Sequence, residues 1–351
     1  MASYILKRLL LMIPTLVGVM LVTFIVTQFV PGGPVEQLIS QLEGAQGSGG
    51  EVSSSTSGLY HGARGLSEEH IQKLNELYGF DKPAYQRFFD MMWRYMQFDL
   101  GDSYFYNKSV IELIISKLPV SISLGVWSFL IVYLTCIPLG IKKAVKDGTR
   151  FDVISSTVIL VGYAIPGFVL GVMLLVLFGG GSFWDIFPLK GLISDNWNEL
   201  PWHMKILDYL WHMVLPITAS IVGSFAVLTM LTKNSFLEEI RKQYVLTAKA
   251  KGLNENAVLY RHVFRNAMIP IITGFPGAFI AAFFTGSLLI ETIFSLDGLG
   301  LLSYESILKR DYPVVLGSLF FYTILGLFAK LLADISYVII DPRIQFESVS
   351  K

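Results

Sequence analysis

The sequence of 351 residues contains a single cysteine, Cys136, which lies within a long apolar run. One thiol excludes a disulfide within the chain and any metal site built from several cysteines. Charged residues are also scarce, at 15% of the chain, whereas hydrophobic residues reach 53%. Soluble domains average about 25% charged and about 45–50% apolar residues, so this composition points away from that class.

Sequence signatures of common catalytic sites are absent as well. No G-x-x-x-x-G-K-[S/T] phosphate loop occurs, since the glycine-rich GSGGE at 47–51 lacks the lysine, and the chain is therefore not itself a Walker-type ATPase. Neither an H-E-x-x-H zinc motif nor a G-x-S-x-G serine motif is present. We expect no catalytic residue, no metal and no other cofactor bound by this chain.

What the sequence has instead is six long apolar runs. A membrane-spanning helix needs about 20 predominantly apolar residues, whereas helices of soluble proteins average only about 11–12 residues. The first run exceeds the roughly 7–15 apolar residues of a signal peptide, so we expect a retained span. The predicted fold class is an all-α membrane protein with six transmembrane helices. The runs lie near residues 9–30, 118–141, 153–178, 212–232, 268–294 and 313–340.

Positive charge is distributed unevenly between these runs. With the N-terminus in the cytoplasm, the cytoplasmic segments hold 15 Lys and Arg, and the short outer segments hold four. Lys and Arg are retained on the cytoplasmic side during insertion, so we expect both termini in the cytoplasm. The cytoplasmic segments are then 1–8, 142–152, 233–267 and 341–351, and the short outer segments are 179–211 and 295–312.

Three regions follow from this topology. Residues 1–30 contain the N-terminal end and first span, 31–117 form a large outer loop, and 118–351 contain the other five spans with a cytoplasmic loop at 234–267. Seven Gly and five Ser at 44–65 predict a flexible insert in the outer loop. A helix is expected next, at 67–79, from its capping and stop residues.

An aromatic stripe with helical spacing follows Pro83. It either rests on the outer membrane surface or the mouth of the bundle, or it forms a docking rim for a partner. The stripe consists of Tyr85, Phe88, Phe89, Met92, Trp93 and Met96.

The segment 234–267 is basic and carries strong helix signals. One helix is predicted from about Ser235 to Lys251, since cations in its last turn suit the helix dipole. Gly252 stands where a Schellman stop needs a left-handed residue, and Asn254 can cap a second helix. We therefore expect a helix, a sharp turn and a second helix against the inner membrane face.

This turn combines small residues with positive charge. From physical chemistry alone, it can dock into a groove of another protein or be attracted to anionic lipid as a basic amphipathic segment. The candidate docking residues are Thr247, Ala248, Lys249, Ala250, Lys251, Gly252, Leu253 and Arg241.

Few ionisable groups interrupt the apolar runs, where such groups are costly. Lys330 and Asp334 are four residues apart in the sixth run, so they can form a structural ion pair or serve a gate. Glu291 follows Thr285 and Ser287 in the fifth run, and it either lines the mouth of a passage or reaches the membrane interface. These five residues are the candidate pathway or gate residues.

Prolines and closely spaced glycines predict local geometry within the runs. Pro166, Pro270 and Pro276 are expected to bend their helices. Gly167 and Gly171 form a G-x-x-x-G pattern, which is compatible with close contact between helices.

Short strings spread over nearly the whole chain carry a family resemblance. They include RLLLMIPTLVGV at 8–19, VPGGP at 30–34, FDLGDS at 98–103, TAKAKG at 247–252, RHVFRNAMIP at 261–270, FSLDGLGLL at 294–302 and DPRI at 341–344. Together they resemble permeases of ATP-binding-cassette (ABC) importers, in particular the dipeptide/oligopeptide permease family. The general importer pattern Glu-Ala-Ala-x-x-x-Gly is only partly kept, since Leu246 and Thr247 replace its first two residues. The Thr-Ala variant of the peptide importers fits throughout.

Three features are most similar to one branch of that family, the YejB branch, which is associated with uptake of oligopeptides and of the peptide-nucleotide microcin C. These are the Gly/Ser insert, YGFDKP at 78–83 and LTKNSFLEEIRKQYV at 231–245.

The resemblance implies a type I importer permease in the bacterial inner membrane, with 244–256 as a coupling helix docked on a cytoplasmic ABC ATPase. It implies half of a peptide pathway from periplasm to cytoplasm, completed by a second homologous permease and supplied by a periplasmic substrate-binding protein. ATP and Mg would be bound by the partner ATPase, and no nucleic acid is expected. The alternatives are an ion-gradient-driven secondary transporter acting alone and an intramembrane enzyme.

Overall fold

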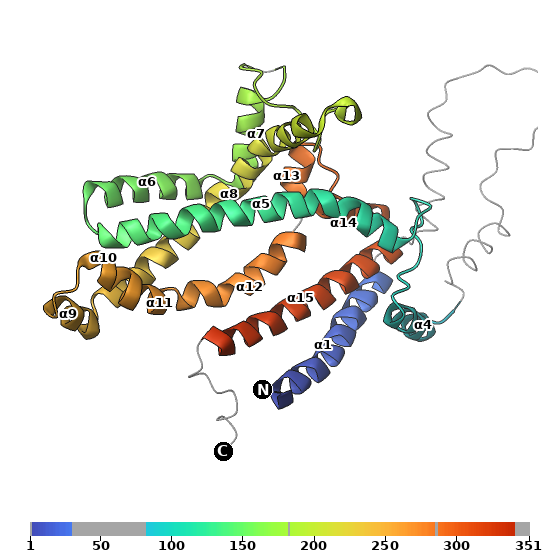
Figure 1. The fold of residues 1–351 in the computed structure, drawn as a ribbon. Coiled ribbons are helices and arrows are strands. Elements are labelled where there is room, and N and C mark those ends of the chain that lie inside the picture. The colour runs from blue at the N-terminus through green and yellow to red at the C-terminus, as the bar shows by residue number, and fades with distance from the viewer. Residues whose placement is uncertain (1, 30–81, 182, 285–286, 341–351) are drawn as a thin grey trace, which may run out of the picture. The chain divides into compact units, whose positions relative to one another are not determined.

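The computed structural model describes residues 2–29, 82–181, 183–284 and 287–340 (Figure 1). The expected insert at 44–65 and helix at 67–79 lie outside these residues. The described residues form helices, connecting turns and two isolated β-bridges, which confirms the predicted all-α class. They fall into two compact units, which are considered separately. The first comprises Met1–Arg8, Ser116–Leu302 and Leu325–Lys351, and the second comprises Leu9–Ile115 and Ser303–Ile324.

Four described helices are long and apolar enough to cross a membrane, and two bent helix pairs raise this number to six if each pair is one span. Each predicted apolar run overlaps one of these helices or pairs, in agreement with six spans. The four helices are α1 (Ala2–Phe29), α5 (Val110–Val145), α8 (Trp202–Ile240) and α15 (Tyr312–Ile340).

The helices extend beyond the predicted runs. The second span was expected from 118 and the fourth from 212, yet α5 begins at Val110 and α8 at Trp202. Pro201 precedes α8 with an extended backbone and sets its start. Backbone hydrogen bonding continues past the apolar stretch, so apolar length underestimates helix length.

The third span is a bent pair, α6 (Arg150–Ala164) and α7 (Gly167–Phe178), with 93° between them (Figure 1). Ile165 between them has an extended backbone and Pro166 is not helical (φ −57°, ψ 133°), so the predicted bend at Pro166 is confirmed. The predicted close helix contact is also present. A Cβ at Gly167 would come within 2.8 Å of the Ala219 carbonyl oxygen of α8.

The fifth span departs from the predicted run of 268–294. A bend of 53° separates the segment ending at Ala267 from α12 (Ile269–Phe284), beside the predicted bend at Pro270. Pro276 lies inside α12. The helix α13 (Leu288–Ile293) is separate, since Ser287 before it is extended, so the single continuous span was wrong.

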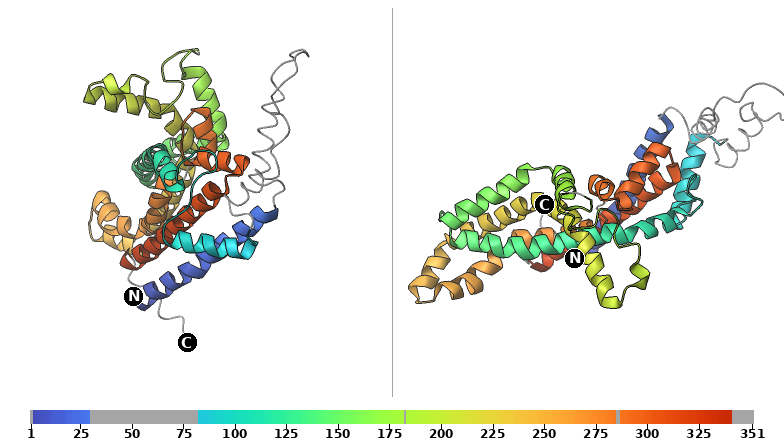
Figure 2. Two further views of the ribbon diagram at one scale, coloured as in Figure 1. Left: turned by 90° about the vertical axis from the view of Figure 1, so that its right-hand side faces the viewer. Right: turned by 90° about the horizontal axis from the view of Figure 1, so that it is seen from above.

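Short helices follow α8 and pack on its end and on α5. They are α9 (Gln243–Ala250), α10 (Glu255–Val258), the π-helical turn η2 (Leu259–Val263) and α11 (Phe264–Ala267). Figure 2 shows α9 to α11 gathered at one end of α8. The core between them is apolar and includes Cys136 of α5, which is 0% exposed. Its other buried members are Val132, Ala144, Leu228, Phe236, Val245, Ala248, Val258, Val263, Ala267, Met268 and Ile271.

In the second unit, α4 (Ala84–Met96) is amphipathic. Its inner face packs on two spanning helices, with Phe88 5.4 Å from Phe24 of α1 and Tyr95 5.0 Å from Phe320 of α15, measured between ring centroids. Phe88 of the predicted stripe is therefore buried against these helices. The face with large exposed side chains consists of Tyr85, Phe89, Trp93 and Met96. Whether lipid or a partner covers it stays a prediction. The same unit includes residues 303–309 of α14 (Leu299–Lys309).

Candidate functional site

The basic segment after α8 does not continue that helix. A single helix from Ser235 to Lys251 was predicted, but α8 ends at Ile240 and α9 starts at Gln243 after an extended Lys242 (φ −74°, ψ 152°). Glu239 stabilises this corner by accepting hydrogen bonds from the Lys242 ammonium and from the Tyr244 hydroxyl, the latter at 2.6 Å. Donation to Glu239 raises the pKa of Lys242. The corner makes α9 a short helix with a direction of its own.

The end of α9 is the predicted Schellman stop. Gly252 has φ +82°, its N–H donates to the Lys249 carbonyl at 2.9 Å, and the Leu253 N–H donates to the Ala248 carbonyl at 3.4 Å. A Cβ on Gly252 would meet no atom within 4 Å, so the backbone conformation, and not crowding, requires glycine here.

The predicted second helix begins where expected. The Asn254 side chain accepts from the Ala257 N–H at 2.7 Å and caps α10. The helix then widens into the π-helical turn η2, which no feature of the sequence indicated. Such turns are rare and often lie at functional sites.

One face of α9 is buried and the other is exposed. Val245 and Ala248 insert into the apolar core with Phe236 of α8. Ala248, at 7% exposure, is thus buried, so the prediction that the turn presents this residue at its surface was wrong. Its single methyl group lets α9 approach the core closely.

The other predicted docking residues stay at the surface. Leu246 of α9 is 57% exposed and Leu253, just after it, is 37% exposed, so the outer face of α9 and the following turn offer apolar area with cations around it. Arg241, at the base of α9, contacts Asp147 at 3.4 Å. The exposed set consists of Thr247, Lys249, Ala250, Lys251, Gly252 and Leu253.

A cavity of about 850 Å³ lies in the first unit, between α5, α7, α8, α12 and α13. Its lining is apolar with scattered hydroxyl groups, and none of its lining residues carries a charge. Three of them are glycines: Gly125 and Gly167 pack against the backbones of Ala282 and Ala219, and only Gly223 faces open space. The hydroxyl groups belong to Ser128, Tyr133, Ser220, Ser224 and Ser287.

The predicted pathway residues separate into different roles. Ser287 lines the cavity, and Thr285 lies outside the described residues. Glu291 neither lines the cavity nor reaches the surface, because its side chain is 0% exposed and accepts from the backbone N–H groups of Leu301 at 2.7 Å and Ser287 at 3.1 Å. Neither alternative for Glu291 was right: it holds the turn after α13 against that helix.

The predicted pairing of Lys330 with Asp334 is also wrong. Asp334 forms an ion pair with Arg8 at 2.9 Å, and no contact between Lys330 and Asp334 within 4 Å occurs in the described part of the chain. The side chain of Lys330 is exposed. A sequence pattern within one helix could not reveal that a basic residue far away in the chain competes for this carboxylate.

No group of three or more His, Cys, Asp or Glu side chains that could hold a metal ion occurs among the described residues. Helices long enough to cross a membrane, an uncharged cavity between them and a short helix packed on their ends define a membrane transport subunit. The family described as binding-protein-dependent transport system inner membrane component matches residues 136–346, and the chain belongs to this family.

Similar proteins extend over the whole length of the chain. It is 58% identical to the peptidoglycan transport system permease protein YejB of Agrobacterium fabrum, with 99% of each chain covered. It is 54% identical to the inner membrane ABC transporter permease protein YejB of Escherichia coli O157:H7, covering 99% of this chain and 100% of that one. The dipeptide transport system permease protein DppB of Escherichia coli K12 is 34% identical over 98% of this chain and 99% of its own.

These relatives confirm the predicted resemblance to ABC importer permeases and to the YejB branch. The chain is a membrane-embedded permease component, and the ATPase of such systems is a separate subunit. An ATPase and a binding protein are therefore its partners as a class.

Proposed function

We propose that the chain is one of two permease subunits of an ATP-driven importer that moves peptides from the periplasm to the cytoplasm. The helix α9 carries the proposal. Its inner face is packed in the core with α5 and α8, and Leu246 on its outer face and Leu253 in the following turn are exposed to a partner. Such a helix can receive motion from an ATPase and pass it to the spans.

Peptide as the substrate class is supported by the relatives and by the cavity. The relative at 58% identity is named as a permease of a peptidoglycan transport system, and the one at 54% as a permease of an ABC transporter. The relative at 34% identity is named as a permease of a dipeptide transport system. An uncharged lining with hydroxyl groups suits a substrate recognised through its backbone, because no fixed charge selects its side chains. Oligopeptides, peptide conjugates of the microcin C type and peptide-bearing fragments of peptidoglycan all share that backbone.

The assembly is proposed from the family. A second permease of similar fold completes the pathway, and a periplasmic binding protein delivers the substrate. ATP and Mg bind to the ATPase, which docks on 244–256. Both termini of this chain lie in the cytoplasm, as the distribution of Lys and Arg indicates. ATP-driven closure moves α9, and the spans around the cavity alternate between outward and inward access.

Reconstitution tests this function directly. The chain is co-expressed with its companion permease and ATPase, placed in liposomes, and supplied with the binding protein and with labelled tri-alanine or a muramyl tripeptide. We expect uptake that requires ATP and all the subunits. Uptake driven by an ion gradient through the purified chain alone would instead establish a secondary transporter.

A substitution in the cavity wall tests whether the substrate passes through the cavity. Gly223→Leu adds a branched side chain where a Cβ meets no atom within 4 Å, in a helix that tolerates leucine. We expect uptake to fall about tenfold, equivalent to about 1.4 kcal/mol, with assembly unchanged. Gly18→Leu in α1 is the matched control, since its Cβ also meets nothing and it does not line the cavity. Equal uptake by the two variants would exclude this cavity from the pathway.

A further inference from the structure

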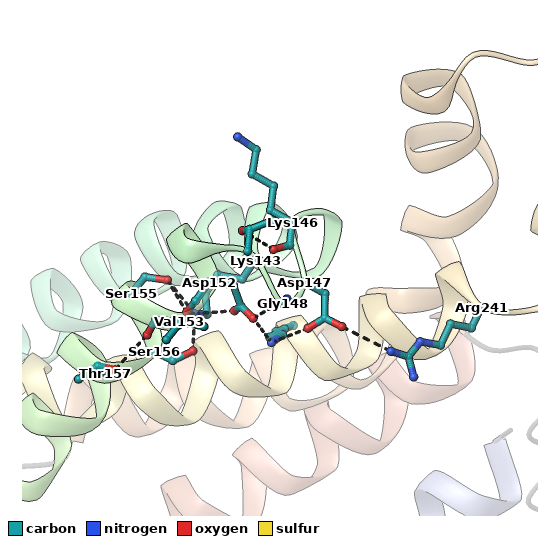
Figure 3. Close-up of polar contacts among 12 residues, drawn as sticks. Lys143, Lys146, Asp147, Gly148, Asp152, Val153, Ser155, Ser156, Thr157 and Arg241 are labelled. Carbon is teal, nitrogen blue, oxygen red and sulfur yellow. Dashed lines mark hydrogen bonds and ion pairs between the residues drawn. The ribbon is translucent and has the colours of Figure 1, made fainter.

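A network of ion pairs joins the ends of α5, α6 and α8 at the base of α9 (Figure 3). At its centre lies Lys143, whose side chain is 0% exposed. The ammonium contacts Asp152 Oδ1 at 3.0 Å and donates to the hydroxyl oxygens of Ser155 at 2.8 Å and Ser156 at 2.7 Å. It also donates to the backbone carbonyl of Asp152 at 2.9 Å. This cation from α5 is thus held entirely by the first turns of α6.

The network continues to α8. The Lys233 ammonium lies 2.7 Å from Asp152 Oδ2 and 2.9 Å from Asp147 Oδ1. The Gly148 N–H donates to the same Asp152 oxygen at 3.2 Å, which fixes the turn between α5 and α6. Lys233 therefore connects α8 to both carboxylates of the hairpin formed by α5 and α6.

The last member connects the network to α9. Arg241 lies 3.4 Å from Asp147 Oδ2, and Figure 3 shows its side chain reaching toward that carboxylate. Arg241 stands two residues before the first residue of α9. Asp147 is shared between Lys233, whose side chain is 14% exposed, and Arg241, whose side chain is 70% exposed.

The inner and outer parts of this network have different physical roles. Removing one partner from a buried ion pair leaves an uncompensated charge, so Lys143 and Asp152 are needed for folding. Ion pairs between exposed side chains contribute little to stability. The contact of Asp147 with Arg241 is therefore expected to add little to stability, and its removal should leave the fold intact.

We propose that Asp147 and Arg241 are positioning residues that pass the movement of α9 to α5 and so to the cavity wall. This rests on the proposed function. The helix α5 is continuous from Lys143, near its end, to Tyr133 and Ser128 in the cavity lining. These residues are about 15 Å and about 22 Å along the helix from Lys143, at about 1.5 Å per residue. The apolar core holds the inner face of α9, and the ion pair adds a polar contact between its base and the hairpin.

The test uses the reconstituted complex and measures ATP hydrolysed per peptide imported. The variants are Asp147→Asn, Arg241→Gln and the double variant, with the probe that the wild type transports, tri-alanine or the muramyl tripeptide. We expect Arg241→Gln to raise the ratio about fivefold, and Asp147→Asn, which also loses the contact with Lys233, to raise it at least as much. The double variant should raise it no further than Asp147→Asn, because Arg241 then has no contact left to lose. A role in stability alone would change the amount of complex and leave this ratio unchanged.

Lys146→Gln is the matched control. Lys146 adjoins Asp147 in sequence, and its side chain points away from the network (Figure 3). The substitution removes one positive charge, as Arg241→Gln does. Its ratio is expected to equal that of the wild type. If Asp147→Asn fails to assemble, Arg241→Gln gives the same measurement, since its side chain is largely exposed.

The outcomes separate this inference from the proposed function. A wild-type complex without ATP-dependent uptake would refute the function itself. A wild type that couples normally, beside single variants whose ratio matches Lys146→Gln, would refute the link alone. Additive effects in the double variant would likewise show that Asp147 and Arg241 act separately.

Discussion

Gly252→Pro is expected to abolish ATP-dependent peptide uptake while the chain still inserts into the membrane. Proline is held near φ −65° and has no N–H, whereas Gly252 has φ +82° and donates to Lys249. The penalty of about 3 kcal/mol or more for a misplaced proline exceeds the roughly 1.4 kcal/mol that changes a population tenfold. The Schellman stop would open, and the exposed face of α9 would lose its fixed shape.

Gly252→Asn is the matched control for this prediction. Asparagine enters the left-handed region more readily than other residues with a Cβ, and the space beside Gly252 is open. We expect this variant to keep most of the uptake and of the transport-coupled ATP hydrolysis. Both activities are measured on the reconstituted complex. Normal uptake by Gly252→Pro would refute α9 as the element that receives motion from the ATPase.

Glu291→Ala is expected to destabilise the permease by about 3 kcal/mol or more, since each of three donors left without a partner costs at least about 1 kcal/mol. The Glu291 carboxylate accepts from Ser287, Leu301 and Gly300, and all three donors would lose their acceptor. Around it the chain is closely packed, because a Cβ at Gly298 would come within 2.5 Å of Glu291 Cδ. In the variant, water is therefore not expected to replace the carboxylate as acceptor unless the turn moves.

The measurement is thermal unfolding of the detergent-purified complex, together with its yield. Asp297→Ala is the control, because Asp297 lies in the same turn, is 66% exposed and pairs with Lys117, whose side chain is 19% exposed. Its loss is expected to cost about 1 kcal/mol or less. A Glu291→Ala variant as stable as this control, but defective in uptake, would return Glu291 to the pathway and overturn its structural role.

Features with local causes could be predicted from the sequence. The stop at Gly252 and the cap at Asn254 depend on hydrogen bonds between neighbours in the chain, so their residue types were informative. The six apolar runs and the bend at Pro166 are likewise local. The break between α8 and α9 at Lys242 was not predicted, because it is stabilised by side-chain hydrogen bonds to Glu239 from Lys242 and Tyr244, and helix propensity does not include such contacts.

Features made by packing could not be predicted in this way. The sequence around Ala248 is typical of a surface turn, and only packing against Phe236 and its neighbours makes Ala248 a core residue. The cavity and the ion pairs of Lys143 join helices that are separate in sequence. Asp334 had two possible basic partners, and the nearer one in sequence was the wrong choice.

The enclosed thiol of Cys136 has a practical consequence for probe chemistry. The chain has no other cysteine, and this sulfur is shielded from reagents by α8, with the Phe225 carbonyl 3.8 Å away. A maleimide dye or spin label would therefore react selectively with a cysteine introduced at Lys251 or Leu246, without prior removal of the native one. Distance changes of α9 during turnover can thus be recorded on an otherwise unaltered permease.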